Sequence, residues 1–153
     1  MSNKKIAIIA SKGSLDWGYP PFLYAATAHA LGYECRMFFT FGGLHLIKRD
    51  LQPCMNLIGN PGIPTKLPVF LRFLPGVRAM ATHRAEQRLK ENGLASLEEL
   101  RQTCIDAKIP MYACQMTAEL LGCAPSDLVD EAMYGGAATF FDFAGEADIC
   151  LFI

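Results

Sequence analysis

The chain has 153 residues, a length that suits one domain spanning residues 1–153 and burying roughly two-thirds of the surface that its unfolded chain exposes. Hydrophobic residues make up 52% and charged residues 19%, so we expect some apolar surface to remain for contacts between subunits. The formal net charge is −1, and no cluster of basic and aromatic residues stands out, which argues against nucleic acid as a partner. The apolar run Ile6–Ala10 is shorter than a signal-peptide core, and this predicts a cytoplasmic protein.

The six cysteines form no Cys-x-x-Cys pair, and the three histidines lie at no spacing typical of a zinc site. Without a secretory signal, an even number of cysteines does not imply disulfides, so we expect reduced thiols. The Gly-x-Gly-x-x-Gly and P-loop patterns are also missing. The sequence therefore predicts no metal, no nucleotide and no other cofactor.

The first third of the chain alternates between strand and helix patterns. Lys5–Ser11 is a continuous apolar run of the kind that forms a strand buried on both faces. Pro20 and Pro21 are expected to open a helix that stops at Gly32. Glu34–Thr40 is the second expected strand, and the glycines after it predict a loop that allows close approach of backbone or ligand.

Residues 52–76 predict an irregular apolar insertion, because five prolines interrupt any regular pattern there. A long irregular stretch inside a compact domain is usually a lid, a binding loop or an interface arm. The apolar run Leu67–Leu74 is too short to cross a bilayer. Peripheral contact with a membrane stays open as an alternative, but the sequence does not favour it.

The second half repeats the alternation. Val77–Asn92 has an amphipathic helical pattern, and a capping box at Ser96 begins a further helix. An apolar strand then leads to Cys114, and a short helix ends at Gly122. The rest predicts a short segment at Val129–Met133, a helix over Ala137–Ala147 and a final buried strand over Asp148–Ile153. This alternation predicts an α/β sandwich with a mostly parallel sheet.

Cys114 is the leading candidate for chemistry, because the pattern places it where a strand enters the first turn of a helix. Unpaired N–H groups and the helix dipole at such a position stabilise a thiolate, which is the nucleophilic form of cysteine. A free cysteine is also among the most buried residue types, so a packing role for Cys114 stays open.

The expected turns at the carboxyl edge of the sheet would surround this thiol. They lie at Ser11–Pro21, Thr40–Leu44, Cys114–Thr117 and Tyr134–Ala138, and their N–H groups suit a small anionic or sulfur-bearing group. Cys104 falls on the inward stripe of the preceding helix, where a packing role is favoured over a resolving or relay role. Packing is likewise expected for the cysteines inside strands, Cys35 and Cys150.

Three segments, Ala113–Thr117, Tyr134–Phe140 and Phe38–Leu44, together resemble the DsrE/DsrF-like sulfurtransferase family, in its branch often labelled peroxiredoxin-like. The resemblance spans nearly the whole chain. It implies a flavodoxin-like three-layer sandwich around a mostly parallel five-stranded sheet, and a homo-oligomer of three, four or six subunits. It also implies a protein that needs no cofactor.

The same resemblance implies a function in sulfur trafficking. Cys114 would accept sulfane sulfur as a persulfide and pass it to a TusA-like carrier or a rhodanese, with Cys104 as a second thiol. The residues expected to line the pocket around Cys114 are Gly43, Gln115, Met116, Thr117, Gly135 and Gly136.

Two alternatives from other classes stay open. A thiol peroxidase or redox sensor would oxidise Cys114 to a sulfenic acid, although the segment after Cys114 lacks the arginine that peroxidases generally have near the cysteine. A non-catalytic oligomeric scaffold would use Cys114 for packing and the insertion as its interface.

Overall fold

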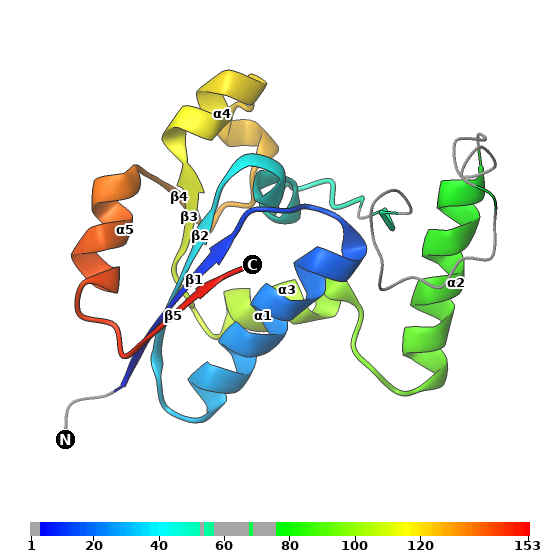
Figure 1. The fold of residues 1–153 in the computed structure, drawn as a ribbon, viewed down its shortest axis with the longest axis horizontal. Helices are drawn as coiled ribbons and strands as arrows, with labels where there is room; N and C mark the ends of the chain where they lie inside the picture. The colour runs from blue at the N-terminus through cyan, green and yellow to red at the C-terminus, as the bar shows by residue number, and fades with distance from the viewer. Residues whose placement is uncertain (1–3, 53, 57–67, 69–75) are drawn as a thin grey trace.

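The computed structural model describes residues 4–52, 54–56, 68 and 76–153. Strands and helices alternate along these residues, as the sequence pattern predicts (Figure 1). The strands are β1 (Lys5–Ala10), β2 (Glu34–Phe39), β3 (Met111–Cys114), β4 (Ala132–Gly135) and β5 (Ile149–Phe152). The α-helices are α1 (Leu15–Ala30), α2 (Val77–Glu91), α3 (Leu97–Asp106), α4 (Gln115–Leu121) and α5 (Ala137–Ala144), and the 3₁₀ helices are η1 (Phe41–Ile47) and η3 (Pro125–Asp127).

The five strands form one sheet in the order β4-β3-β2-β1-β5, and every neighbouring pair is parallel. The chain therefore steps outward from β1 to β4 and then returns to the other side of β1. In a parallel sheet all the strands end at one edge, so the turns that follow them meet there. The expected α/β class with a five-stranded parallel sheet is confirmed.

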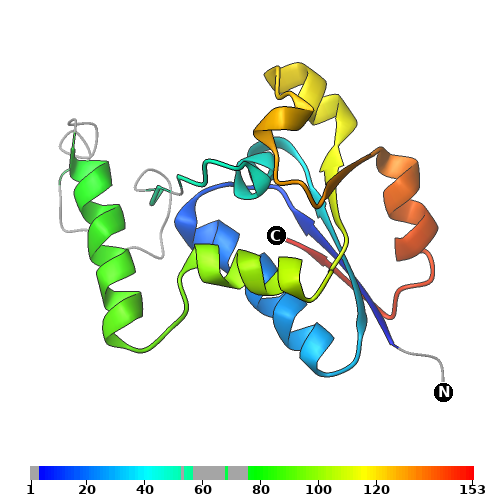
Figure 2. The ribbon, with the colours of Figure 1, turned by 180° about the vertical axis from the view of Figure 1, so that it is seen from behind.

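The main core lies between one face of the sheet and the helices α1 and α3, which cover that face side by side (Figure 2). Alternate residues of each central strand point into it, such as Ile6 and Ile8 of β1 and Met37 and Phe39 of β2. Phe22 of α1 contacts Phe39, with ring centroids 5.7 Å apart. These apolar side chains hold the two layers together.

The opposite face of the sheet is covered by α5 alone among the described helices, and this completes the three layers (Figure 1). Phe140 of α5 packs on Phe38 of β2, with ring centroids 5.6 Å apart, and the buried Phe143 lies under Arg36. β5 is an edge strand whose residues are exposed or half-exposed, so the expectation of a buried final strand was wrong. Cys150 within it is exposed, which also contradicts the packing role expected for that cysteine.

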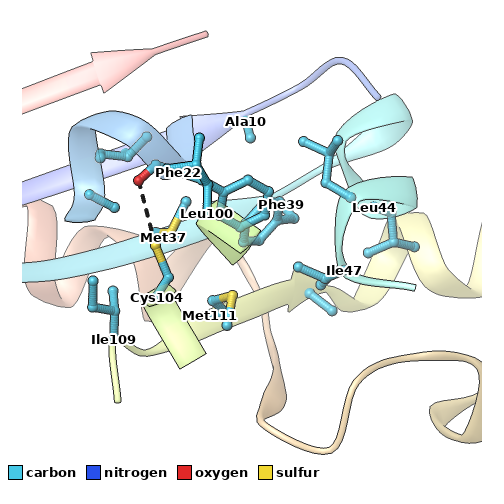
Figure 3. Close-up of a cluster of buried hydrophobic side chains, with 14 of the residues drawn as sticks. Ala10, Phe22, Met37, Phe39, Leu44, Ile47, Leu100, Cys104, Ile109 and Met111 are labelled. Carbon is cyan, nitrogen blue, oxygen red and sulfur yellow. Dashed lines mark hydrogen bonds between the residues drawn. The ribbon is translucent and has the colours of Figure 1, made fainter. Parts of the chain in front are cut away.

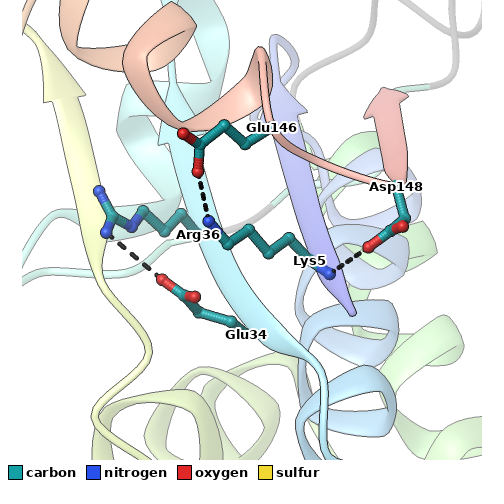
Figure 4. Close-up of polar contacts among 5 residues, drawn as sticks. All are labelled: Lys5, Glu34, Arg36, Glu146 and Asp148. Atoms are coloured by element: carbon teal, nitrogen blue, oxygen red, sulfur yellow. Dashed lines mark hydrogen bonds and ion pairs between the residues drawn. The ribbon is translucent and has the colours of Figure 1, made fainter. Parts of the chain in front are cut away.

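Polar contacts at the start of β1 attach the last part of the chain to the sheet (Figure 4). The Lys5 ammonium lies 2.6 Å from a carboxylate oxygen of Glu146, and the Lys5 backbone N–H donates to Asp148 at 2.7 Å. A second ion pair joins Arg36 and Glu34 on β2. These contacts place the turn between α5 and β5 against the amino end of the sheet, far from the edge where the functional turns meet.

The helix boundaries correct one expectation and confirm another. The first helix begins at Leu15, five residues before the expected start, and Pro20 and Pro21 lie inside it. Both prolines lie beyond the first turn, so each lacks an N–H that could donate to the carbonyl four residues earlier, and the helix nevertheless continues through them with Pro21 and Phe22 buried. The capping box at Ser96 is confirmed: its hydroxyl accepts the Glu99 N–H at 3.2 Å, and the Glu99 carboxylate accepts the Ser96 N–H at 2.6 Å.

Most of the expected insertion at 52–76 lies outside the described residues. The helix α2 that follows it lies to one side of the sandwich (Figure 1). Met55 is tied to this helix, because its N–H donates to the Thr82 hydroxyl at 2.9 Å. Among the described residues, no helix combines the length and apolar character needed to cross a membrane.

Candidate functional site

Cys114 lies at the junction of β3 and α4, as the last residue of the strand and the N-cap of the helix. The sequence favours this junction because an apolar strand runs directly into a helix-forming segment, and the αL glycine Gly122 ends that helix. The side chain of Cys114 is 7% exposed, so its sulfur lies just beneath the surface. The predicted position of the cysteine at a helix N-terminus is confirmed.

Hydrogen-bond donors surround the sulfur of Cys114. Burial raises the pKa of this thiol, but hydrogen bonds from the hydroxyl and N–H of Thr117, the hydroxyl of Thr40 and the N–H of Met116 together outweigh burial and lower the pKa below its ordinary value. Donors stabilise a thiolate because the charged sulfur can only accept hydrogen bonds. The site is therefore arranged to hold a sulfur anion.

Thr117 is the centre of this arrangement. It is fully buried, and its Oγ1 lies 3.2 Å from the Oγ1 of Thr40 and accepts the Phe41 N–H at 3.2 Å. Because the Phe41 N–H occupies an acceptor position on Oγ1, the Thr117 hydroxyl proton is left to point toward a neighbouring acceptor. Phe41 itself has a φ of +44°, an unusual conformation for a residue with a large side chain.

Thr40 is a site residue that the sequence analysis did not single out. It follows β2, the strand next to β3, and so reaches the same edge of the sheet as Cys114. A hydroxyl residue directly after the neighbouring parallel strand is the signal that would have found it. The sequence predicted the strand Glu34–Thr40, but it did not predict that this strand lies next to β3.

The two predicted glycines at the end of β4 also reach this edge. Gly135 pairs with Cys114 in the strand register, and a Cβ on it would lie 3.1 Å from the Tyr112 ring and 3.2 Å from Thr139. Gly136 is the N-cap of α5. Their turn therefore lies beside the thiol, and Gly135 permits close packing of α5 on the strand.

The remaining predicted pocket residues divide into two groups. Gln115 and Met116 follow the thiol directly; the Gln115 amide donates to Glu119 at 3.0 Å, and the Met116 side chain is 62% exposed. Gly43 instead packs against β1, where a Cβ would lie 2.0 Å from the carbonyl oxygen of Ala10. Its role in the fold is to let η1 approach the end of β1, because no larger residue fits.

Cys104 lies in a different environment from Cys114, within the core formed by α1, α3 and the sheet (Figure 3). It is fully buried, and its thiol donates to the Phe22 carbonyl at 3.5 Å. Burial raises its pKa to about 12. The structure thus places Cys104 against α1 rather than among the donors around Cys114.

No group of three or more histidine, cysteine, aspartate or glutamate side chains that could hold a metal ion occurs among the described residues. The donors at the site are hydroxyl and N–H groups, which suit an anionic sulfur rather than a metal. The arrangement can stabilise a thiolate, a persulfide anion or the thiolate that leaves when a persulfide loses its outer sulfur.

Comparison with known proteins identifies the family and agrees with the fold. The model of the DsrE/DsrF/DrsH-like family matches residues 2–152. The chain is 50% identical to the sulfur carrier protein DsrE2 of Allochromatium vinosum, over the full length of both proteins. It is 25% identical to the uncharacterized protein YrkE of Bacillus subtilis, covering 98% of this chain and 97% of that protein.

The structure is also similar to the crystal structure of the ychN protein from E. coli, with a TM-score of 0.63. The match covers 99% of this chain and all of that one, at 10% sequence identity. At this identity the likeness concerns the fold alone.

Proposed function

The chain belongs to the DsrE/DsrF/DrsH-like family, and on this premise we propose that it is a sulfur carrier whose Cys114 accepts sulfane sulfur as a persulfide and passes it to a partner protein. The observation that carries the proposal is the cluster of donors that lowers the pKa of this thiol despite its burial. The name of the relative from Allochromatium vinosum, a sulfur carrier at 50% identity, supports the same function.

Loading begins with the thiolate of Cys114. Its sulfur attacks the outer sulfur of a donor R–S–SH, a new S–S bond forms, and the S–S bond of the donor breaks, with its electron pair leaving on R–S⁻. The product, Cys114–S–SH, loses its proton to give the persulfide anion. No outside oxidant or reductant is needed, because the sulfane sulfur keeps its oxidation state throughout.

Delivery reverses the roles. A thiolate of the acceptor attacks the outer sulfur of the Cys114 persulfide, and the electron pair of the broken S–S bond returns to Cys114. The hydroxyl and N–H of Thr117 then stabilise the leaving thiolate, just as they stabilise the attacking one. The same donors therefore serve both transfers.

Exposed apolar side chains beside the thiol support docking of the acceptor at α4. Met116 and Leu120 are both largely exposed on this helix, whose first residue follows Cys114. Methionine and leucine at such a surface suit an adaptable protein contact. We assign this surface to a TusA-like carrier or a rhodanese.

The environment of Cys104 supports a packing role for it. Its complete burial and its pKa of about 12 leave almost no thiolate at neutral pH. Sulfur transfer between Cys104 and Cys114 would require the core between α1 and the sheet to open. The proposed cycle therefore uses Cys114 alone.

A homo-oligomer also belongs to this proposal. On the sheet face that α5 covers only in part, Met133, Phe141 and Phe152 are exposed, the last at 74%. Large apolar side chains gathered on one face are typical of subunit contacts. Light scattering on the purified chain, with Phe152→Glu as the weakened variant and Leu31→Glu as the control on another surface, tests this point.

The decisive experiment is peptide-resolved mass spectrometry after incubation with polysulfide or thiosulfate. We expect a reducible gain of sulfur on the Cys114 peptide of the wild type and of Cys104→Ala, and no gain at that peptide in Cys114→Ser. Cys150→Ser serves as the matched control, because Cys150 is an exposed thiol away from the donors. Sulfur on Cys150 alone would contradict the proposal.

The two alternatives give different results in the same experiment. A peroxidase or redox sensor would take no sulfur from any donor, and peroxide would convert Cys114 to a sulfenic acid. No arginine is among the groups that lower the pKa of Cys114, which does not favour that chemistry. A scaffold would keep its assembly state in Cys114→Ser and react with neither reagent at this position.

A further inference from the structure

A second cavity lies at the carboxyl edge of the sheet, and Cys114 is not among its lining residues. Its volume is about 950 Å³, and it is lined by the turn between β1 and α1, by η1 and the segment that follows it, and by residues of α2 and η3. This volume is near the upper end of the range for small-molecule sites. Four cationic side chains line it: Lys12, Lys48, Arg49 and Arg78.

Most of this positive charge is not neutralised within the chain. Every Asp and Glu of the sequence lies in the described residues, and none of them is within ion-pair distance of Lys12, Lys48 or Arg78. The sequence between Asp50 and Glu86 contains no acidic residue at all. The carboxylates of Asp50 and Asp127 also line the cavity, but neither lies within ion-pair distance of Lys12, Lys48 or Arg78.

The acidic groups at the cavity have other partners. Asp127 accepts the Ala124 N–H at 2.9 Å, and Asp50 accepts the Gln52 amide at 2.9 Å. Only Arg49 of the four cations has an ion pair, with Asp130. The carboxylates at this cavity thus have roles in local turns, while three cations remain for a ligand.

Two further features add positive potential. α1 begins at the cavity, and its N-cap Ser14 makes no side-chain capping hydrogen bond, so this hydroxyl is left for a ligand. The amino end of a helix carries a partial positive charge and favours anions. The Lys12 ammonium lies 3.2 Å from the centre of the Trp17 ring, a contact that holds the lysine at the cavity while leaving its donors free.

We propose that this cavity binds a small molecule with a doubly charged tetrahedral oxyanion group, of the sulfur or phosphorus oxyanion class. Ammonium, guanidinium and hydroxyl donors from separate elements line the cavity, and such donors match the several oxygens of this group. The volume leaves room for a substituent beyond that group. This site is independent of the proposed sulfur transfer, since it does not include Cys114.

The first test titrates inorganic phosphate and thiosulfate into the full chain by calorimetry, with chloride at matched ionic strength as the control. We expect both dianions to bind, and Lys48→Gln and Arg78→Gln each to weaken binding about threefold, with roughly a tenfold loss in the double variant. Arg84→Gln removes a cation of α2 that does not line the cavity, so its affinity should equal that of the wild type. Equal affinities for the wild type and the double variant would overturn the proposal.

A second test uses the wild-type chain alone. Cys54 lines the cavity, whereas the exposed Cys150 does not. Phosphate should slow alkylation of Cys54 at least about threefold and leave that of Cys150 unchanged, because an occupied cavity restricts access to the first thiol only. Unchanged labelling of Cys54 at saturating phosphate would contradict the site.

Cys114→Ser should bind phosphate as the wild type does, so loss of sulfur loading and loss of anion binding are separable results.

Discussion

Cys114 and Cys104 are both buried thiols ten residues apart, yet the protein gives them opposite chemical character. Cys114 faces the hydroxyl and N–H donors of Thr117, and its pKa is lowered. Cys104 donates to the Phe22 carbonyl among apolar side chains, and burial raises its pKa to about 12. The comparison teaches that burial alone keeps a thiol protonated, whereas hydrogen-bond donors around a buried thiol can outweigh burial and favour the thiolate.

The largest expected effect is the difference in alkylation rate between the two thiols. At pH 7 a thiol with a pKa of about 12 is ionised in only about one molecule in 10⁵, and its core must open before a reagent can enter. We expect Cys114 to be labelled by iodoacetamide at least roughly a thousandfold faster than Cys104, as followed by peptide mass spectrometry. Comparable rates for the two peptides would show that the core opens readily, and the contrast would be lost.

Removal of the central donor should bring Cys114 closer to an ordinary buried thiol. Thr117→Val keeps the shape of the side chain but loses the hydroxyl, and a hydrogen bond to a charged group contributes about 1.5–3 kcal/mol. The alkylation rate of Cys114 at pH 7 should fall roughly tenfold or more, and its pH midpoint should move upward. Thr117→Ser is the matched control and should retain the wild-type profile; if Val and Ser behave alike, the hydroxyl has no role.

A smaller effect is expected from Cys104→Ala, which tests the packing role of the second thiol in the comparison. Loss of one buried sulfur leaves a small cavity and should lower the free energy of unfolding by about 1 kcal/mol in urea titrations. Sulfur loading of Cys114 should be unchanged, since Cys104 is placed in the core. A stable variant that no longer loads sulfur would instead give Cys104 a role in transfer.

The smallest effect is on how stability depends on pH, and its sign should differ between the thiols. Because the pKa of Cys114 is lowered in the folded state, its contribution is present above the ordinary thiol pKa and lost as the pH falls through the folded value. Cys104 has a raised pKa, so its contribution is present below the ordinary thiol pKa and lost as the pH rises toward about 12.

Unfolding free energies of the wild type, Cys114→Ser and Cys104→Ala, measured across the thiol titration range, test these signs. The stability difference between the wild type and Cys114→Ser should grow with pH just below the ordinary thiol pKa. The difference between the wild type and Cys104→Ala should shrink above it. Parallel curves for the two variants would mean that the folded state perturbs the two thiols alike.

The sequence predicted the first two strands well because buried parallel strands are short apolar runs that end at turn-forming residues. Lys5–Ser11 and Glu34–Thr40 each agree with the observed strands to within one residue. It failed at the start of α1, where the prolines suggested a boundary that the packing of Leu15 against the core moved earlier. It also failed at β5, because an edge strand and a central strand can have the same apolar pattern.

For the candidate site, the sequence located the thiol, Thr117 and the turn Thr40–Leu44, but not the individual groups of that turn that reach the site. Cys114 and Thr117 belong to one continuous segment, so a strand followed by a helix was enough to bring them together. Thr40 and the N–H of Phe41 come from a turn more than seventy residues earlier. They approach Cys114 because β2 lies beside β3, and the order of strands in a sheet cannot be deduced from the local sequence pattern.

By itself, the sequence determined the α/β alternation, the family and the placement of a cysteine at a helix N-terminus, because these depend on local apolar periodicity and short contiguous motifs. Tertiary structure alone decided which thiol is surrounded by donors, which is closed in the core and where unpaired cations converge. Those properties arise from the order of strands in the sheet and from contacts between distant segments, and the pKa of a thiol responds to exactly such neighbours in space.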